Sequence, residues 1–474
     1  MEADTNPDKN LRLTALIVVC IGSFLIPFMG SSLNIVLPVI QKELSVNLII
    51  LSWIPTVFVL ANAATILPLG RLGDIIGRKR VYAYGMVIYI LASLFAGISS
   101  SGIMLVCFSF LQGIGCAMIF ASAVALLSSV YPSNQRGEAL GAYITAVYIG
   151  LFLGPLLGGF LANNLGWRSI FLFNVPVGII SLILIKLKLH GDWKGYDGEK
   201  FEKSGSIIYI FALLTILYGI SSFQTKLGQI ILLAGIFGLV IFILKERNSK
   251  NPILRLNIFK KRISSLSALA LLLMNIATTS MWAILSLYFQ DIMSLNPLTT
   301  ALILSVQPLM VAILSVPVGK LADRIENRTF SIMGMFLVTI GLIIFSTLKP
   351  GTEIYIPITG LIIVGIGLGL FNSPTTNKFM GSIEGKDYGM AGATLSTMIY
   401  VGQTLSLSIM LFIFSIYLGN VQINVSNFSL YLLSLKTAFT AFAIITGFGV
   451  IVTLFIGSNN QKKSLKQIHD KIHH

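Results

Sequence analysis

The chain of 474 residues is 55% apolar and only 11% charged, and its formal net charge is +15. A membrane-spanning helix needs roughly 20 apolar residues, so this composition suffices for on the order of thirteen spans. Soluble domains carry roughly 25% charged residues, so a soluble enzyme, a disordered protein and a disulfide-rich secreted domain are excluded. The positive charge fits basic loops on the cytoplasmic side of a membrane better than a nucleic-acid partner.

Apolar runs separated by polar or Gly/Pro-rich breaks predict fourteen membrane-spanning helices. A β-barrel is not expected, because the runs do not alternate apolar and polar residues. The first run is too long for the apolar part of a signal peptide and has no clear cleavage site, so we expect it to be retained. The expected spans cover residues 13–38, 48–69, 81–98, 103–130, 138–161, 168–187, 205–222, 228–245, 264–290, 297–318, 329–348, 353–376, 388–417 and 431–456.

The distribution of basic residues predicts the side that each loop faces. With a cytoplasmic N-terminus, 28 of the 33 Lys and Arg residues fall in inside segments and 5 fall outside. Because Lys and Arg gather in cytoplasmic loops, this bias predicts an even number of spans. We therefore expect a multi-pass plasma-membrane protein with both termini in the cytoplasm.

The three cysteines, Cys20, Cys107 and Cys116, all lie inside apolar runs and form no CxxC spacing. We interpret them as inert thiols. No metal ligand set and no cofactor-binding motif is recognised in the sequence, so we expect neither a metal nor a cofactor.

A short pattern occurs twice. Residues 68–80 read PLGRLGDIIGRKR after the second span, and residues 317–328 read PVGKLADRIENR after the tenth. Eight spans separate the copies, which predicts two six-span halves with two extra spans inserted between them. Repeated halves are typical of secondary transporters. The expected division is a tail at 1–12, a first bundle at 13–187, an insertion at 188–263, a second bundle at 264–456 and a basic cytoplasmic tail at 457–474.

The repeated pattern suits a latch between the halves. Asp74 and Arg78 are four residues apart and can meet on one helical turn. Asp74 could also face the N-terminus of a neighbouring helix, whose partial positive charge would favour the carboxylate. The alternative is a solvated basic loop. The expected gating residues are Gly70, Arg71, Asp74, Gly77, Arg78 and Lys79, and the second-half copy comprises Gly319, Lys320, Asp323 and Arg324.

The fifth span contains a stripe of small residues. Gly150, Gly154 and Gly158 are spaced by four, which allows a neighbouring helix to approach closely. Pro155 interrupts the hydrogen-bond ladder and can kink the span, and Gly159 extends the small surface. Such a tight, bent helix between the halves could limit leak, although plain helix packing is the alternative.

Several segments together resemble the major facilitator superfamily, and within it the fourteen-span drug:proton antiporter family. GRLGDIIGRKR at 70–80 is similar to its signature cytoplasmic loop, and GLFLGPLLGG at 150–159 is similar to its antiporter motif. WRSIFLFNVPVG at 167–178 and ERNSKNPILRLNIFKKR at 246–262 resemble its sixth span and the loop after its eighth span. The resemblance covers nearly the whole chain and implies an all-α fold. It also implies that Arg136 pairs with Asp74 at the cytoplasmic gate.

The sequence departs from the family at two charged positions. In the first span, Asn34 and Pro38 keep the family pattern, but Met29 stands where the family usually has an acidic residue. In the fourth span, Ser109 stands where the family usually has Arg. The resemblance assigns those charges to proton coupling, so coupling is in doubt unless Asp291 or Asp74 has taken the role.

Neutral polar residues remain inside the expected spans, and a cavity between the halves could be lined by several of them. Each could equally be a hydrogen bond between helices. The candidates are Asn34, Asn62, Gln112, Asn275, Trp282, Gln290, Gln307, Asn372 and Gln403.

Four functions are compatible with this pattern to different degrees. The favoured one is a monomeric secondary exporter of small lipophilic compounds, with membrane lipids around it and protons left open as the coupling ion. A lipid or lipid-linked translocase on the same fold is the alternative, and a transport-inactive sensor remains open. An intramembrane enzyme is disfavoured, because no ionisable base stands at span depth. Without a buried carboxylate, we expect neutral or weakly anionic substrates rather than permanent cations.

Overall fold

The computed structural model describes residues 9–46, 48–196, 198–221, 223, 225–249, 251–323, 327–417 and 428–456. Within these ranges every regular element is a helix. Among the described residues, fourteen helical segments are long and apolar enough to cross a membrane, which confirms the expected all-α polytopic architecture. Arg324 and the tail at 457–474 lie outside the described residues.

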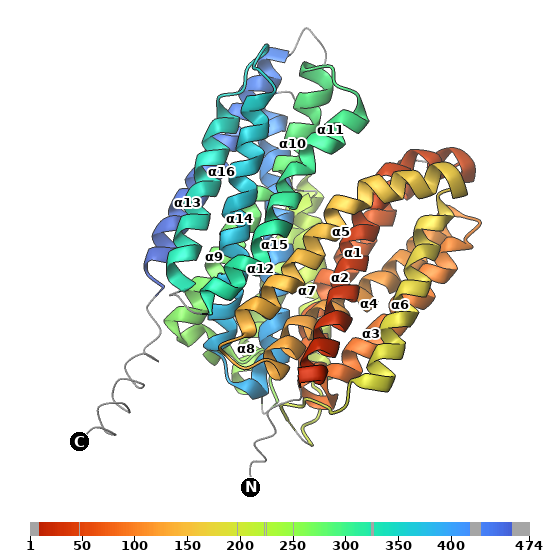
Figure 1. The fold of residues 1–474 in the computed structure, drawn as a ribbon, viewed down its shortest axis with the longest axis vertical. Coiled ribbons are helices and arrows are strands. Elements are labelled where there is room, and N and C mark those ends of the chain that lie inside the picture. The colour runs from red at the N-terminus through yellow and green to blue at the C-terminus, as the bar shows by residue number, and fades with distance from the viewer. Residues whose placement is uncertain are drawn as a thin grey trace.

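The first six spans pack as one bundle (Figure 1). The helix α1 packs along α5, α2 packs on α4, and α3 packs between α4 and α6. Their bounds are α1 Lys9–Leu44, α2 Leu48–Ile76, α3 Arg78–Gly97, α4 Gly102–Val130, α5 Arg136–Leu165 and α6 Arg168–Lys188.

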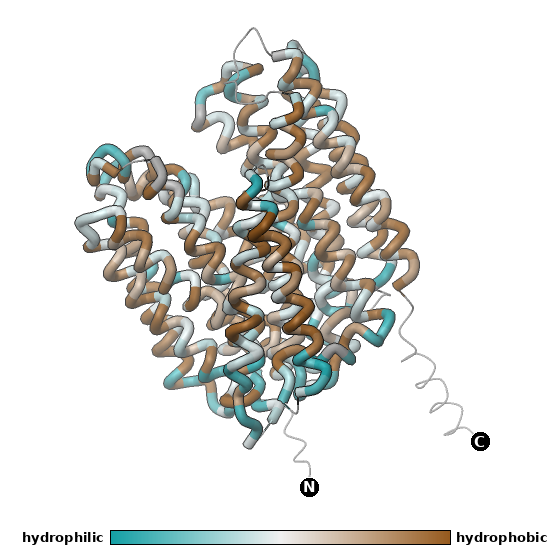
Figure 2. Tube along the Cα trace, turned by 180° about the vertical axis from the view of Figure 1, so that it is seen from behind, coloured by the Kyte–Doolittle hydropathy of each residue, from teal (hydrophilic) through white to brown (hydrophobic). Residues whose placement is uncertain are grey.

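The next two helices, α7 (Lys203–Ser221) and α8 (Lys226–Asn248), form a hairpin. The helix α7 touches both α2 and α15 (Tyr388–Tyr417), whereas α8 packs chiefly against α7. Figure 2 shows the apolar hairpin crossing the rear of the molecule. The extra spans therefore cover one of the two seams between the halves.

The remaining helices form the second bundle. Besides α15 they are α9 Arg262–Thr278, α10 Met281–Leu287, α11 Pro297–Leu304, α12 Val306–Ala322, α13 Asn327–Ser346, α14 Tyr355–Gly381 and α16 Phe428–Leu454. Shorter turns lie at η1 Leu256–Lys260, η2 Tyr288–Ile292 and η3 Gly385–Asp387.

Two expected spans, 264–290 and 297–318, are interrupted helices rather than continuous ones. At the first break, the backbone N–H of Ser280 donates to the Ser406 hydroxyl at 2.9 Å instead of continuing the helical ladder. The second break falls at Ser305, three residues before Pro308, whose ring nitrogen has no proton for the helical carbonyl four residues earlier. Apolar periodicity could not reveal either break.

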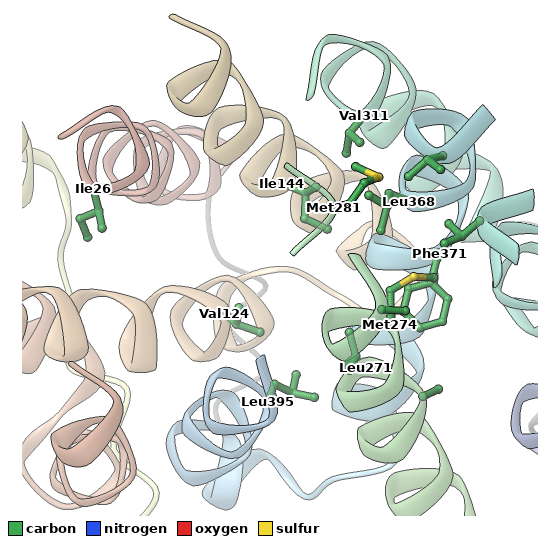
Figure 3. Close-up of a cluster of buried hydrophobic side chains, with 14 of the residues drawn as sticks. Ile26, Val124, Ile144, Leu271, Met274, Met281, Val311, Leu368, Phe371 and Leu395 are labelled. Atoms are coloured by element: carbon green, nitrogen blue, oxygen red, sulfur yellow. The ribbon is translucent and has the colours of Figure 1, made fainter. Parts of the chain in front are cut away.

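Helices of both halves meet in one apolar core at the end of the molecule where α2 and α12 finish and where α5 and α15 begin. We call this the closed end. Figure 3 shows Val124 of α4, Ile144 of α5 and Leu395 of α15 in the same cluster as Val311 of α12 and Phe371 of α14. Toward the opposite end the two bundles diverge (Figure 1).

Candidate functional site

Asp74 of the first copy of the repeat lies at the closed end and is fully buried. Its two carboxylate oxygens accept hydrogen bonds from the backbone N–H groups of Gly389 and Met390, at 2.7 and 2.8 Å. These N–H groups belong to the first turn of α15, where the helix carries partial positive charge. Asp74 therefore ties the first half to the start of a helix of the second half.

Asp323 of the second copy makes the reciprocal contact. Its carboxylate accepts hydrogen bonds from the backbone N–H groups of Gly137 and Glu138, at 2.8 and 3.0 Å. These groups belong to the first turn of α5. The amide of Asn377 donates a further bond to Asp323 at 3.2 Å. The internal repeat is thus a pair of helix caps exchanged between the halves, and we call them the Asp74 lock and the Asp323 lock.

The surroundings of the two carboxylates differ. Arg78 donates to Asp74 through Nε and Nη2, at 3.0 and 2.8 Å, and the guanidinium also donates to the carbonyls of Gly385 and Lys386. Among the described residues no basic side chain forms an ion pair with Asp323. Burial raises the pKa of Asp323 above its usual range, and the bonds from Glu138 and Gly137 oppose this shift.

The pairing that the resemblance implies for Arg136 is not formed. Arg136 donates to the Tyr388 hydroxyl at 2.9 Å and to the Ser128 carbonyl at 3.2 Å, and its guanidinium lies over the Tyr388 ring. Asp74 is already occupied by Arg78 and by the two amides of α15. Arg136 therefore supports the start of α15 one residue before the Asp74 contacts.

Glycine is required at the first turn of both capped helices. A Cβ on Gly389 would stand 2.5 Å from Oδ1 of Asp74, and one on Gly137 would stand 2.6 Å from Oδ1 of Asp323. Both glycines are followed at the second position by alanine, Ala139 and Ala391. Sequence reasoning missed these partners, although the shared Gly-x-Ala start of two spans is a signal that could have found them.

The segment between α6 and α7 passes under the Asp74 lock. The backbone N–H groups of Gly195 and Tyr196 donate to the Asp74 carbonyl at 2.8 and 3.0 Å, and the N–H of Arg78 donates to the Trp193 carbonyl at 3.1 Å. We call the described residues 189–196 and 198–202 the strap. The sequence predicts this segment only as part of the insertion at 188–263, with no contact to the repeated motif.

Tyr196 of the strap is clamped between the halves. Its ring lies between the guanidinium groups of Arg71 and Arg255, at 4.4 and 4.5 Å from the ring centroid. Its hydroxyl donates to Asp387 at 2.7 Å, and burial and this carboxylate raise the pKa of the phenol. Glu199 pairs with Arg71 and, at 3.7 Å, with Arg255. The phenol stays protonated and thereby joins α2 to the turn before α15.

The remaining residues of the repeated loop have simpler positions. Gly77 joins α2 to α3 with φ of 115°, a conformation that favours glycine. Lys79 is half-buried in the first turn of α3. Gly319 packs against the carbonyl of Gly137, and Nζ of Lys320 lies 3.9 Å from Oε1 of Glu138. Several residues of the second copy therefore contact the first turn of α5.

The glycine stripe of α5 faces α1 of the same half. A Cβ on Gly150 would meet the Phe24 carbonyl at 2.5 Å, and Gly154 and Gly158 lie against Ser31 and Ser32. Pro155 lies within the stripe and Gly159 beside it, where nothing stands within 4 Å of its Cβ position. The contact of α5 with the other half uses a different face, where Thr145 donates to the Ala312 carbonyl at 2.9 Å.

The two positions where the resemblance implies charged residues are buried inside the first half. Met29 is 2% exposed, and its sulfur lies 3.4 Å from the amide nitrogen of Asn174, whose oxygen lies 3.4 Å from the Tyr89 hydroxyl. Ser109 is 1% exposed. Asp291 lies exposed in η2, at the end of its span. None of these residues places a carboxylate at mid-span.

The candidate cavity residues separate into two groups. Two lie beside the opposite half, because Asn372 donates to the Tyr148 hydroxyl at 3.3 Å and Asn62 lies next to Tyr400. Three of the others bond within their own half: Gln112 donates to Ser93, Asn275 to the Leu271 carbonyl and Gln290 to Ser286. The remaining four are described by their burial alone, with Asn34 exposed, Gln307 buried, and Trp282 and Gln403 half-buried.

Comparison with known proteins places this geometry in a family. The riboflavin transporter RibZ of Clostridioides difficile is 27% identical over 94% of this chain and 98% of its own length. The multidrug resistance protein Stp of Mycobacterium tuberculosis is 28% identical over 84% of this chain and 75% of its own. The puromycin resistance protein pur8 of Streptomyces alboniger is 26% identical over 85% and 82%.

Solved structures agree on the fold. The human organic anion transporter MFSD10 superposes with a TM-score of 0.65 at 12% identity, covering 96% of this chain and all of that one. The proton:xylose symporter XylE superposes with a TM-score of 0.68 at 10% identity, covering 95% and 97%. The sequence model of the Major Facilitator Superfamily matches residues 19–407, and the chain therefore belongs to this superfamily of multi-pass membrane transporters.

Proposed function

We propose that this transporter exports small lipophilic compounds by alternating access. The observation that carries the proposal is the reciprocal pair of locks, in which each half caps a helix of the other at one end while the bundles diverge at the other end. Such an arrangement has two discrete states, locks made and locks broken. Rocking of two halves around a site near the middle of the membrane is the transport cycle that this geometry supports.

The relatives support a broad substrate class. Two of the transporters reported above are named for drug or antibiotic resistance, and one is named for riboflavin. The division of this chain into two six-span halves, 13–187 and 264–456, with the insertion at 188–263, is part of the proposal. So are a monomeric state, a plasma-membrane location and a cytoplasmic position for both termini.

This chain differs from the family that it resembles at the positions to which the resemblance assigns proton coupling. Met29 and Ser109 replace the charged positions, and both are enclosed within the first half. A cation at the bilayer centre costs roughly 2.5–3.5 kcal/mol on insertion scales, and a buried carboxylate usually offsets this cost. We therefore propose that neutral or weakly anionic amphiphiles are preferred and that proton coupling is weak.

The test is transport into proteoliposomes with and without an imposed pH gradient, using a neutral lipophile beside ethidium. We expect the neutral compound to move and ethidium to move poorly, with little response to the gradient. Robust, gradient-driven ethidium transport would show that the charge argument is wrong. Failure of every lipophile to move would instead remove the export proposal.

The orientation has its own test. Tags placed before Met1 and after His474 should both be reached only from the cytoplasmic side, and a cysteine at Lys42 should react with an impermeant reagent from outside. Labelling of that cysteine only from the cytoplasmic side would invert the proposed topology.

A further inference from the structure

Four side chains from four spans gather where the two halves meet. Tyr400 of α15 packs against the apolar cluster that contains Ala63 of α2 and Ala117 of α4, and the neighbouring Asn62 and Cys116 lie near its hydroxyl. Tyr143 of α5 lies within electrostatic range of Cys116 and Tyr400. The locks do not use this group, which contains no acidic and no basic residue.

The amide of Asn62 is not satisfied. The residue is 0% exposed, and neither its nitrogen nor its oxygen has a hydrogen bond of normal geometry. A carboxamide offers two N–H donors and two lone pairs, so the nearby phenol of Tyr400 could satisfy only one of them. Buried amides in the same half are satisfied differently: Asn174 donates to the Ile170 carbonyl and Gln112 to Ser93. Native proteins rarely leave a buried polar group without a partner unless it has a use.

The group lies near the middle of the membrane. Asn62 precedes Asp74 on α2 by ~12 residues, or about 18 Å of helix, and Tyr400 follows Gly389 on α15 by a similar length. The hydrocarbon core of a bilayer is about 30 Å thick. The amide is therefore about as far from the locks as a centrally bound substrate would be.

The closed part of the molecule ends at this level. On α15 the residues 391–397 are all buried, whereas the residues 398–401, which include Tyr400, are only half-buried. On α2 the residues 61–64 are buried, and the residues 57 and 58 before them are half-buried. The group thus lies at the boundary between the sealed region and the region where the halves diverge.

We propose that Asn62, together with Tyr400 and Tyr143, binds an uncharged planar ring that carries a cyclic imide or lactam edge. A carboxamide donates and accepts side by side, which matches an edge with an adjacent N–H and C=O. The two phenol rings offer flat apolar surfaces with hydroxyl groups at their tips. No carboxylate of the described residues stands at this depth, so the site has no charge for a cation. This inference rests on the proposed function and specifies its substrate.

The experiment measures binding, not transport. Lumiflavin carries an imide edge and is fluorescent, and its N3-methyl derivative lacks the imide proton but keeps the ring. We expect the purified full-length protein in detergent to bind lumiflavin at least about tenfold more tightly than the methylated compound. The variant Asn62→Leu, which keeps a similar shape, should lose this preference. The variant Asn174→Leu is the matched control, because it removes a satisfied buried amide and should keep the preference.

Thermal stability separates a ligand site from a structural role. Without ligand, Asn62→Leu should melt at the same or a higher temperature than the natural protein, because an unsatisfied amide is removed, whereas Asn174→Leu should melt lower. Tyr400→Phe gives a second variant if Asn62→Leu does not fold, and it should weaken lumiflavin binding severalfold.

Two outcomes would overturn the inference: equal affinity for both compounds in the natural protein, or an unchanged tenfold preference in Asn62→Leu. Transport of neutral lipophiles without any lumiflavin preference would remove the inference and leave the proposed function standing. Imide-selective binding without transport of any compound would remove the proposed function and leave the binding site standing.

Discussion

The Asp74 and Asp323 locks occupy equivalent positions in the two halves and cap equivalent helices, but among the described residues only the Asp74 lock contains an ion pair. Asp74 and Arg78 are both almost fully buried, and Arg78 bonds to carbonyls of the second half as well. Asp323 has the neutral Asn377 instead. At the position four residues after Asp323 the sequence has Asn327 where the first copy has Arg78.

This difference has an energetic meaning. Breaking a buried ion pair by removing one partner costs roughly 3–5 kcal/mol, since the other charge is left unpaired. Neutralising Asp323 strands no ion-pair partner among the described residues, and an amide at this position still accepts one of the two backbone bonds, so the loss is about 1.5–3 kcal/mol for the single bond given up. The two seams of the closed end should therefore contribute unequally to closure, with the Asp74 lock dominating.

Asp74→Asn should have the largest effect. It removes the charge that holds the start of α15 and leaves the buried guanidinium of Arg78 without a counter-ion. We expect the closed end to open in most molecules and transport to fall strongly, while the protein remains inserted and folded. Distances between spin labels at the ends of α2 and α15, measured beside transport in proteoliposomes, check this.

The matched control for Asp74→Asn is Glu43→Gln. Glu43 pairs with Arg168 within the first half, and both side chains are substantially exposed. An exposed pair contributes about 0–1 kcal/mol, so this variant should transport normally. Unchanged turnover in Asp74→Asn would return the repeated motif to an ordinary basic loop.

Arg78→Gln should have the next largest effect. Asp74 keeps its two backbone donors in α15, but the bonds from Arg78 to Gly385 and Lys386 are lost. We expect about half of the Asp74→Asn effect on the closed population. A double mutant with Asp74→Asn should lose less than the sum of the single variants, because the two residues share one interaction. Additive losses would show that they act separately.

Asp323→Asn should have a smaller effect. It weakens the cap on α5. In the part of the chain that the structure describes, no basic side chain forms an ion pair with Asp323, so none is left without its counter-ion. We expect the free energy of closure to become less favourable by about 1.5–3 kcal/mol, and the closed population to fall accordingly. Combined with Asp74→Asn, the losses should add, because the two carboxylates accept hydrogen bonds from different helices and share no partner among the described residues. If Asp323→Asn opens the protein as fully as Asp74→Asn, the proposed inequality of the locks is wrong.

Tyr196→Phe should have the smallest effect. It removes the hydroxyl bond to Asp387 and keeps the ring between Arg71 and Arg255. A hydrogen bond to a charged group contributes about 1.5–3 kcal/mol, and the lower end applies to this half-buried phenol, so transport should change by about tenfold. Tyr196→Ala removes the ring as well and should open the closed end further. Equal behaviour of the two variants would show that the stacking contributes nothing.

Local pattern predicted the span count and the repeat, because both depend on residues close together in the chain. The helix N-terminus proposed for Asp74 is present as well. The partner predicted for Arg136 was Asp74, but Arg136 donates to the Tyr388 hydroxyl. The resemblance implies a basic residue at this position, and it does not determine which nearby acceptor that residue contacts. The strap was missed because its contacts join residues from distant parts of the chain, such as Tyr196 and Asp387.

The hairpin of α7 and α8 gives the molecule a front and a back in the plane of the bilayer. At the rear, α7 bridges α2 and α15, and Tyr209 of α7 packs against Phe242 of α8. At the front, no helix of the described residues lies over the line between α5 and α12 (Figure 1). For a solute that diffuses sideways within the lipid, the approach to the moving parts is therefore one-sided. A neighbouring protein that packs against α5 and α12 would block the approach of such a solute from the lipid, whereas one that packs against α8 would not.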